Sequence, residues 1–188
     1  MLDEIENAIH VLNKGGIILY PTDTVWGIGC DATNQSAVDR IYKLKRRSEN
    51  KTMIILVSDT EMLKDYVDSV PEIAWDLINS FKQPTSIIYP DAKNIAKNLI
   101  GPDGSVAIRV IVKDEFCKQL VTLFGKPIVS TSANFSGETT PLLFNKISEK
   151  IKESVDYVIN IDHDKIKQLK PSTILKLHSD GEFQIIRR

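Results

Sequence analysis

The chain has 188 residues, of which 42% are apolar and 26% charged, and its formal net charge is −1. This length predicts one domain over residues 1–188, with a core large enough to need no disulfide or metal. The balanced charge argues against a protein that binds nucleic acid over its whole surface, although a local basic patch stays open.

Three features of the sequence predict a cytoplasmic protein without membrane association. Cys30 and Cys117 have no metal-binding spacing and suggest no disulfide framework. The first residues, MLDEIENAIHVLNKGG, are acidic and amphipathic, unlike a signal peptide. No apolar run approaches the roughly 20 residues of a membrane helix.

Helices and strands are expected to alternate along the chain. Asp3 and Ser36 are the expected N-caps of the first two helices, and Gly15 is the expected C-cap of the first. The predicted helices cover residues 3–14, 37–47, 60–66, 72–81, 114–124 and 142–153. The predicted strands cover residues 16–20, 52–58, 85–90, 105–112, 126–134 (running into a loop), 155–160, 172–177 and 182–187.

This alternation predicts the α/β class, with a twisted mixed sheet flanked by helices. Ligands of such sheets bind where strands end in loops. Four predicted strand ends carry small polar or charged residues, and we expect them to form the site: residues 22–24, 47–51, 130–137 and 171–173.

The segment YPTDTVWGIGCDAT begins as a strand at Tyr20 and then combines hydroxyls, an acid and glycines. Thr24 offers a hydroxyl, and Gly27 and Gly29 would let the backbone approach a small polar ligand. Asp23 has two open interpretations, since it either anchors the turn or contacts substrate. The segment is not a P-loop, because no Gly-Lys-Ser/Thr follows.

The run KLKRRSENK places five cations in nine residues: Lys43, Lys45, Arg46, Arg47 and Lys51. A solvated helix end explains many such runs, because cations favour the helix C-terminus. Here the run lies between a helix and a buried strand, which indicates a polyphosphate ligand held by bidentate Arg and by Lys.

Two further features belong to strands. STSANFSG ends a buried strand with hydroxyl and amide side chains, which suits a turn and a binding site equally. Arg109 lies in the apolar run SVAIRVIV, where it either pairs with an acid in the core or holds a substrate carboxylate; we favour the carboxylate. The three histidines suggest neither a zinc site nor a Ser–His–Asp triad.

Five motifs carry a resemblance that spans nearly the whole chain. YPTDTVWGIGCDA, IYKLKRRSENKTM, SVAIRV, STSANFSG and PSTIL…IIRR occur in the order and spacing of the YrdC/Sua5 family. The chain resembles the short form without the C-terminal Sua5 domain. The resemblance implies a YrdC-like fold, a twisted α/β sheet around a concave basic cleft.

The resemblance also implies a reaction, because the family includes threonylcarbamoyl-AMP synthases. L-threonine, bicarbonate and ATP, which enters with Mg²⁺, give threonylcarbamoyl-AMP and pyrophosphate. Partner t6A-transfer proteins (TsaD/TsaB/TsaE-like) then pass the group to adenosine 37 of tRNA. Weak binding of tRNA itself stays open, and the metal is expected to have no protein side-chain ligand.

Site residues carry over where the motifs match. The threonine side is implied for Thr24, Arg109, Ser132 and Ser172. The ATP side is implied for Lys45, Arg47, Lys51, Ser105, Asn134, Thr173 and Arg187, with Lys45 and Arg47 as the catalytic pair.

The chain departs from the family pattern at several prolines. Ser48, Thr52 and Ile111 stand where the family has proline, and FKQPTS replaces Trp-Pro-Gly-Pro-Leu-Thr. A loop that loses proline is less pre-organised, so we expect weaker ATP binding. Three alternatives are an RNA-binding module, a YciO-like paralogue and a carbamoyl-phosphate domain of the hydrogenase maturation type.

Overall fold

The computed structural model describes residues 1–48, 51–165 and 172–187. Nine strands of these residues form one sheet in the order β7-β1-β2-β6-β3-β5-β4-β8-β9. Their bounds are β1 Ile18–Pro21, β2 Trp26–Gly29, β3 Ile54–Val57, β4 Thr85–Tyr89, β5 Val106–Val110, β6 Ile128–Ser132, β7 Tyr157–Val158, β8 Thr173–Leu177 and β9 Phe183–Arg187.

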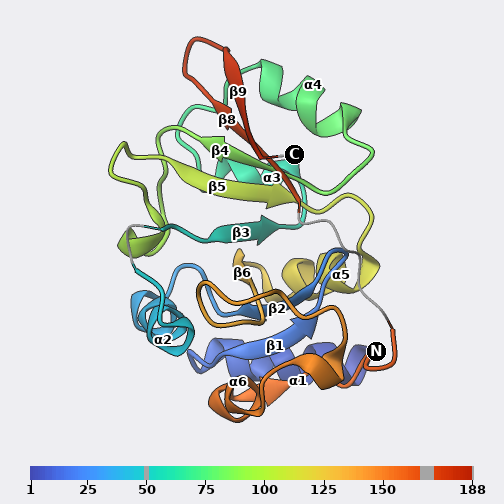
Figure 1. The fold of residues 1–188 in the computed structure, drawn as a ribbon. Coiled ribbons are helices and arrows are strands. Elements are labelled where there is room, and N and C mark those ends of the chain that lie inside the picture. The colour runs from blue at the N-terminus through green and yellow to red at the C-terminus, as the bar shows by residue number, and fades with distance from the viewer. Residues whose placement is uncertain (49–50, 166–171, 188) are drawn as a thin grey trace.

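The sheet is mixed, as the sequence predicts. Three neighbouring pairs are parallel, β1 with β7, β3 with β5 and β4 with β8, and the others are antiparallel. The sheet twists, and β1 (blue) and the β8–β9 pair (red) stand toward its opposite ends in Figure 1. The helices are α1 Leu2–Asn13, α2 Gln35–Lys45, α3 Thr60–Lys64, α4 Ile73–Ser80, α5 Glu115–Phe124 and α6 Glu149–Ser154, with 3-10 turns η1 Lys97–Leu99 and η2 Phe144–Lys146.

Two apolar layers divide the helices between the faces of the sheet. On one face α1 and α5 pack on β1 and β3, with Leu12 and Leu120 in one cluster with Ile18 and Leu56. On the other face α2, α3 and α4 pack over strands from β1 to β4 in a larger cluster. The side chains of β4, β5 and β8 that face the α1/α5 side belong to neither cluster, although several of them are buried. This part of the sheet positions the site.

The segment after Pro21 is a β-hairpin, which the sequence did not predict. β2 pairs with β1 and β6, so Gly27 and Gly29 lie in a strand rather than in a loop. A β-carbon at Gly29 would lie 2.5 Å from the Val129 carbonyl oxygen and 2.8 Å from the Tyr20 ring. These glycines therefore make room for the Tyr20 ring. That they also let the backbone approach a ligand stays a prediction.

Other predicted boundaries also need correction. α2 begins at Gln35, and its N-cap is Asn34, whose side chain accepts from the Ala37 amide, rather than Ser36. Asp3 lies inside the first turn of α1, which has no side-chain cap. The predicted helix over 142–153 is broken, because the Phe144 ring packs on Trp26 and on His163 and leaves only α6 and a 3-10 turn.

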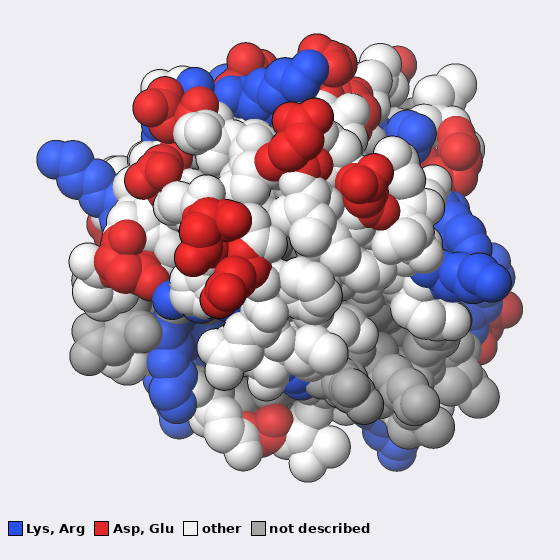
Figure 2. Space-filling model, turned by 90° about the horizontal axis from the view of Figure 1, so that it is seen from above, with Lys and Arg blue, Asp and Glu red and all other residues white. Residues whose placement is uncertain are grey.

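The surface carries charges of both signs. Figure 2 shows acidic and basic side chains interspersed on the face seen from above, so the described residues there form no continuous basic surface. Within the described part of the chain, no helix is long and apolar enough to cross a membrane.

Candidate functional site

A cavity of about 540 Å³ lies beside the uncovered part of the sheet, on the α1/α5 side. All four polar strand ends predicted from the sequence contribute described residues to its wall. Six predicted site residues line it: Thr24, Arg47, Arg109, Ser132, Ser172 and Arg187. Three arginines and no acidic residue are among the described residues of this wall, and one of the three, Arg109, is paired with Asp23.

The hairpin turn between β1 and β2 presents Thr24 to the cavity. Thr22 holds this turn, because its hydroxyl oxygen accepts from the amides of Thr24 and Val25, both at 3.2 Å. The Thr22 hydroxyl also donates to the Val25 carbonyl at 2.6 Å, and its oxygen lies 3.1 Å from the Thr24 hydroxyl oxygen. Thr22 therefore uses its hydrogen-bonding capacity within the turn, while Thr24 lines the cavity.

Arg109 stands at the end of β5, nearly buried. Its guanidinium forms an ion pair with Asp23 of the hairpin turn, Nη2 to Oδ1 at 3.1 Å, and the two side chains are 7% and 25% exposed. The sequence allows Asp23 either to anchor the turn or to contact substrate. For Arg109, pairing with an acid was the less favoured of the two interpretations. The structure shows that pairing, and it also places Arg109 in the cavity wall.

Arg47 follows the left-handed residue Arg46, which ends α2. Its Nε and Nη2 donate to the carbonyls of Lys51 and Thr52, at 2.7 and 2.9 Å. Burial lowers the pKa of Arg47, which still stays protonated at neutral pH. Two donors thus fix the guanidinium plane, and the remaining N–H groups are left for an anion in the cavity.

Lys45 does not line the cavity. Its ammonium is buried, 1% exposed, and donates to the carbonyls of Ser132 and Asn134, the second at 2.7 Å. Burial, with a smaller contribution from Arg47, lowers the pKa of Lys45 to about 8. In this structure Lys45 holds the loop after β6 in place, and its predicted contact with phosphate stays a prediction.

The last strand brings Arg187 to the cavity through a β-bulge. Ile185 pairs with Leu175, but the next pair joins Arg187, not Ile186, to Ile174. The extra residue turns Arg187 onto the cavity side, where Ile174 points. Its Nε and Nη2 donate to the Ser172 carbonyl at 3.1 and 2.8 Å, and burial lowers its pKa.

Besides Lys45, four further predicted ATP-binding residues do not line this cavity. Lys51 is exposed, and the Ser105 hydroxyl donates to Asp103 at 2.6 Å. The Asn134 amide donates to the carbonyls of Phe135 and Glu138, at 2.9 and 2.8 Å. Thr173 alternates with Ser172 and Ile174 on β8 and so faces away from the cavity.

The structure adds polar residues that sequence reasoning missed. Thr140 lines the cavity, and buried Ser86 contacts Ser172, with 3.2 Å between the two hydroxyl oxygens. The polar side chain of Ser86 in the apolar run TSIIYP was a usable signal, since a buried hydroxyl needs a partner. Among the described residues there is no group of three or more His, Cys, Asp or Glu side chains that could hold a metal ion.

Comparison with known proteins shows the family to which the chain belongs. A family model for Sua5/YciO/YrdC proteins, described as "Telomere recombination", matches residues 10–188. A threonylcarbamoyl-AMP synthase of Pseudoalteromonas translucida is 37% identical over 173 residues, which cover 90% of this chain and 91% of that protein.

Solved structures agree. Sua5 of P. abyssi, complexed with L-threonine, superposes with a TM-score of 0.82 at 27% identity over 92% of this chain. The chain spans about half the length of that protein, 50%. E. coli YciO has a TM-score of 0.86 at 24% identity, covering 100% of this chain and 90% of its own, and shares the fold.

Proposed function

We propose, from the premise that this chain belongs to the Sua5/YciO/YrdC family, that it is a threonylcarbamoyl-AMP synthase. The observation that carries the proposal is the convergence of Arg47, Arg109 and Arg187 on one cavity with the Thr24 and Ser132 side chains. Three guanidinium groups from distant segments suit a ligand with several anionic groups. ATP and an amino acid supply them.

The two ends of the cavity take different substrates in this proposal. The Arg109–Asp23 ion pair links β5 to the hairpin turn that carries Thr24. Arg109 and Thr24 would bind the carboxylate and hydroxyl of L-threonine, together with Ser132 and Ser172. Arg47 and Arg187 would bind the phosphates of ATP. Lys45 would act indirectly, because its ammonium holds the carbonyls of Ser132 and Asn134 and so positions the end of β6 and the loop after it.

The reaction proceeds in two steps. The neutral amine of threonine adds to bicarbonate, a C–N bond forms, and water leaves to give a carbamate. A carbamate oxygen then attacks the α-phosphorus of ATP, an O–P bond forms, and pyrophosphate leaves with the electrons of the broken bond. Arg47 would stabilise the charge that develops on pyrophosphate, so catalysis rests on positioning and electrostatics.

The remaining substrates and partners follow from the same proposal. Mg²⁺ enters with ATP and is held by phosphate oxygens and water. Threonylcarbamoyl-AMP is a reactive mixed anhydride, so t6A-transfer proteins of the cytoplasm would consume it for tRNA modification.

One incubation tests the function. Purified protein with ATP, Mg²⁺, bicarbonate and L-threonine should yield threonylcarbamoyl-AMP, detected by mass spectrometry, and pyrophosphate in equal amount. L-serine, which lacks the methyl group, serves as the control substrate and should react more slowly. Absence of the adduct at saturating substrates would reject the assignment and favour a paralogue with the same fold.

A further inference from the structure

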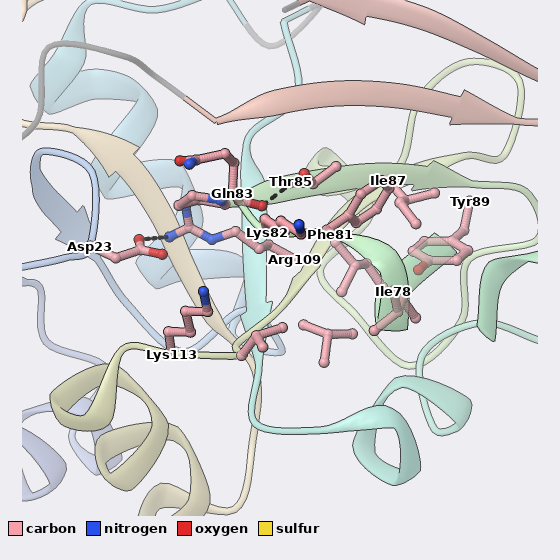
Figure 3. Close-up of a pocket in the computed structure, with 14 residues that line it drawn as sticks. Asp23, Ile78, Phe81, Lys82, Gln83, Thr85, Ile87, Tyr89, Arg109 and Lys113 are labelled. Atoms are coloured by element: carbon pink, nitrogen blue, oxygen red, sulfur yellow. Dashed lines mark hydrogen bonds and ion pairs between the residues drawn. The ribbon is translucent and has the colours of Figure 1, made fainter. Parts of the chain in front are cut away.

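A second cavity, of about 290 Å³, lies on the face of β4 and β5 opposite to the site. Ile78 of α4 and Ile87, Tyr89 and Ile108 of the sheet form its apolar part, as Figure 3 shows for three of them. Water is a poor occupant of a space lined by apolar groups, since each molecule needs two to four polar partners. The interior of this cavity therefore suits an apolar ligand.

The polar residues of this cavity carry mostly positive charge. Lys82 and Lys113 line it together with Arg109, against the single carboxylate of Asp23. In Figure 3 the Lys113 side chain points toward the Asp23–Arg109 pair. Among the described residues neither lysine has an acid within ion-pair distance. This rim has charge complementary to an anion.

Arg109 connects the two cavities, because it belongs to the wall of both. Its partner Asp23 lines the second cavity, while the neighbouring Thr22 and Thr24 line the site. An anion near Lys113 therefore competes with Asp23 for the same guanidinium group.

We propose that this second cavity binds an amphipathic monocarboxylate of about ten non-hydrogen atoms, with its apolar part between α4 and the sheet and its carboxylate at Lys82 and Lys113. The size follows from the volume, since a water-sized group occupies about 30 Å³ of liquid. Occupancy shifts Arg109 away from its position in the site, so this ligand weakens binding there. This second effect rests on the proposed function, and the binding itself does not.

Octanoate, with ten non-hydrogen atoms, is the probe for binding. Calorimetric titration of the full chain should give one site with a dissociation constant below about 1 mM. Octan-1-ol, which lacks the carboxylate, should bind at least about fivefold more weakly. The K82Q/K113Q variant should lose a similar factor, because two rim charges are removed. Lys14→Gln, a change at an exposed lysine outside both cavities, is the matched control and should bind as the native chain does.

A second variant guards against an uninformative result. Val112 is 54% exposed and lines the same cavity, so Val112→Asp adds a repelling charge without disturbing the core and should weaken octanoate binding.

In the threonylcarbamoyl-AMP assay, octanoate should raise the threonine concentration at half-maximal rate and leave that of ATP unchanged. Equal binding of octanol and octanoate, unchanged binding in both variants, or no binding up to 10 mM would overturn the proposal. Binding without an effect on a working enzyme would overturn the coupling alone.

Discussion

Arg47 is the residue on which the proposed chemistry depends most directly. Two backbone carbonyls fix its guanidinium plane, so its free N–H groups are oriented before a ligand arrives. Such pre-organised donors act where charge develops in the transition state.

Replacement of Arg47 by Ala should therefore lower threonine-dependent pyrophosphate release by about a hundredfold or more. Circular dichroism should show an intact fold. Arg46→Ala is the matched control, because Arg46 is the exposed neighbour that stacks on Phe135 at 4.9 Å, and its activity should stay within a few-fold of native. A near-normal rate in the Arg47 variant would remove the basis of the mechanism.

Thr24 tests the threonine end of the site in the same way. Thr24→Val removes a hydroxyl from the cavity wall but keeps the shape of the side chain. We expect the threonine concentration at half-maximal rate to rise by about tenfold, with little change for ATP. Thr24→Ser should restore most of the affinity. The opposite pattern, with ATP affected more, would assign the hairpin turn to the nucleotide.

Lys45 gives the protein a pH-dependent contribution to stability. Its pKa is about 8 in the folded state, below the ordinary value of 10.5, because it is buried. Between these values the unfolded chain binds more protons than the folded chain, so this group makes stability rise with pH. Below pH 8 the buried ammonium is charged in the folded chain, and the free-energy cost of burying it destabilises the fold in full.

The comparison with Lys45→Met isolates this effect. The native chain should gain about 1–2 kcal/mol of unfolding free energy relative to the variant between pH 7.5 and 9.5. Urea unfolding at the two pH values measures the difference, and Lys43→Met, at an exposed position on the same helix, is the control. A constant difference between native and Lys45→Met would mean that Lys45 keeps its ordinary pKa.

At the scale of elements, the β1–β2 hairpin shows why its glycines are needed. The Tyr20 ring lies over both glycines, and the Tyr20 hydroxyl donates to the Val129 carbonyl at 3.2 Å. The close approach of β2 to β6 leaves no room for a β-carbon at Gly29.

Gly29→Ala should destabilise the protein by about 1–3 kcal/mol, because backbone and an aromatic ring must shift. Gly27→Ala is the matched comparison, since its β-carbon would meet side-chain atoms at 3.2–3.3 Å that can yield, and it should cost less. Thermal and urea unfolding measure both. Equal costs would show that the hairpin adapts at Gly29 as easily as at Gly27.

At the scale of the whole molecule, the site joins segments that are far apart in the chain. The hairpin turn, the loop after α2, β5, β6 and β8–β9 all contribute to one cavity. A ligand that contacts several of them stabilises the folded state as a unit, by an amount set by its concentration relative to its dissociation constant.

ATP alone or threonine alone, at about a hundred times its dissociation constant, should raise the unfolding temperature by roughly 5–10 °C. Differential scanning fluorimetry measures the shift. The Arg47→Ala variant should show a clearly smaller shift with ATP, while its response to threonine alone should be retained. An equal ATP shift in both proteins would place the nucleotide elsewhere.

The sequence by itself determined the class of fold, the order of most strands and helices, and the short segments that meet at the site. It could do so because apolar periodicity and polar strand ends are local properties of the chain. The comparisons bear out the family that the five motifs indicated.

Only the tertiary structure decided which side chains face the cavity. Lys45 and Arg47 are two residues apart, yet one binds backbone carbonyls in the interior and the other lines the cavity. Arg187 reaches the cavity because of a bulge in β9. Arg109 forms an ion pair with Asp23, which lies 86 residues earlier in the chain. Pairing register and burial depend on strands distant in sequence, so no local pattern predicts them.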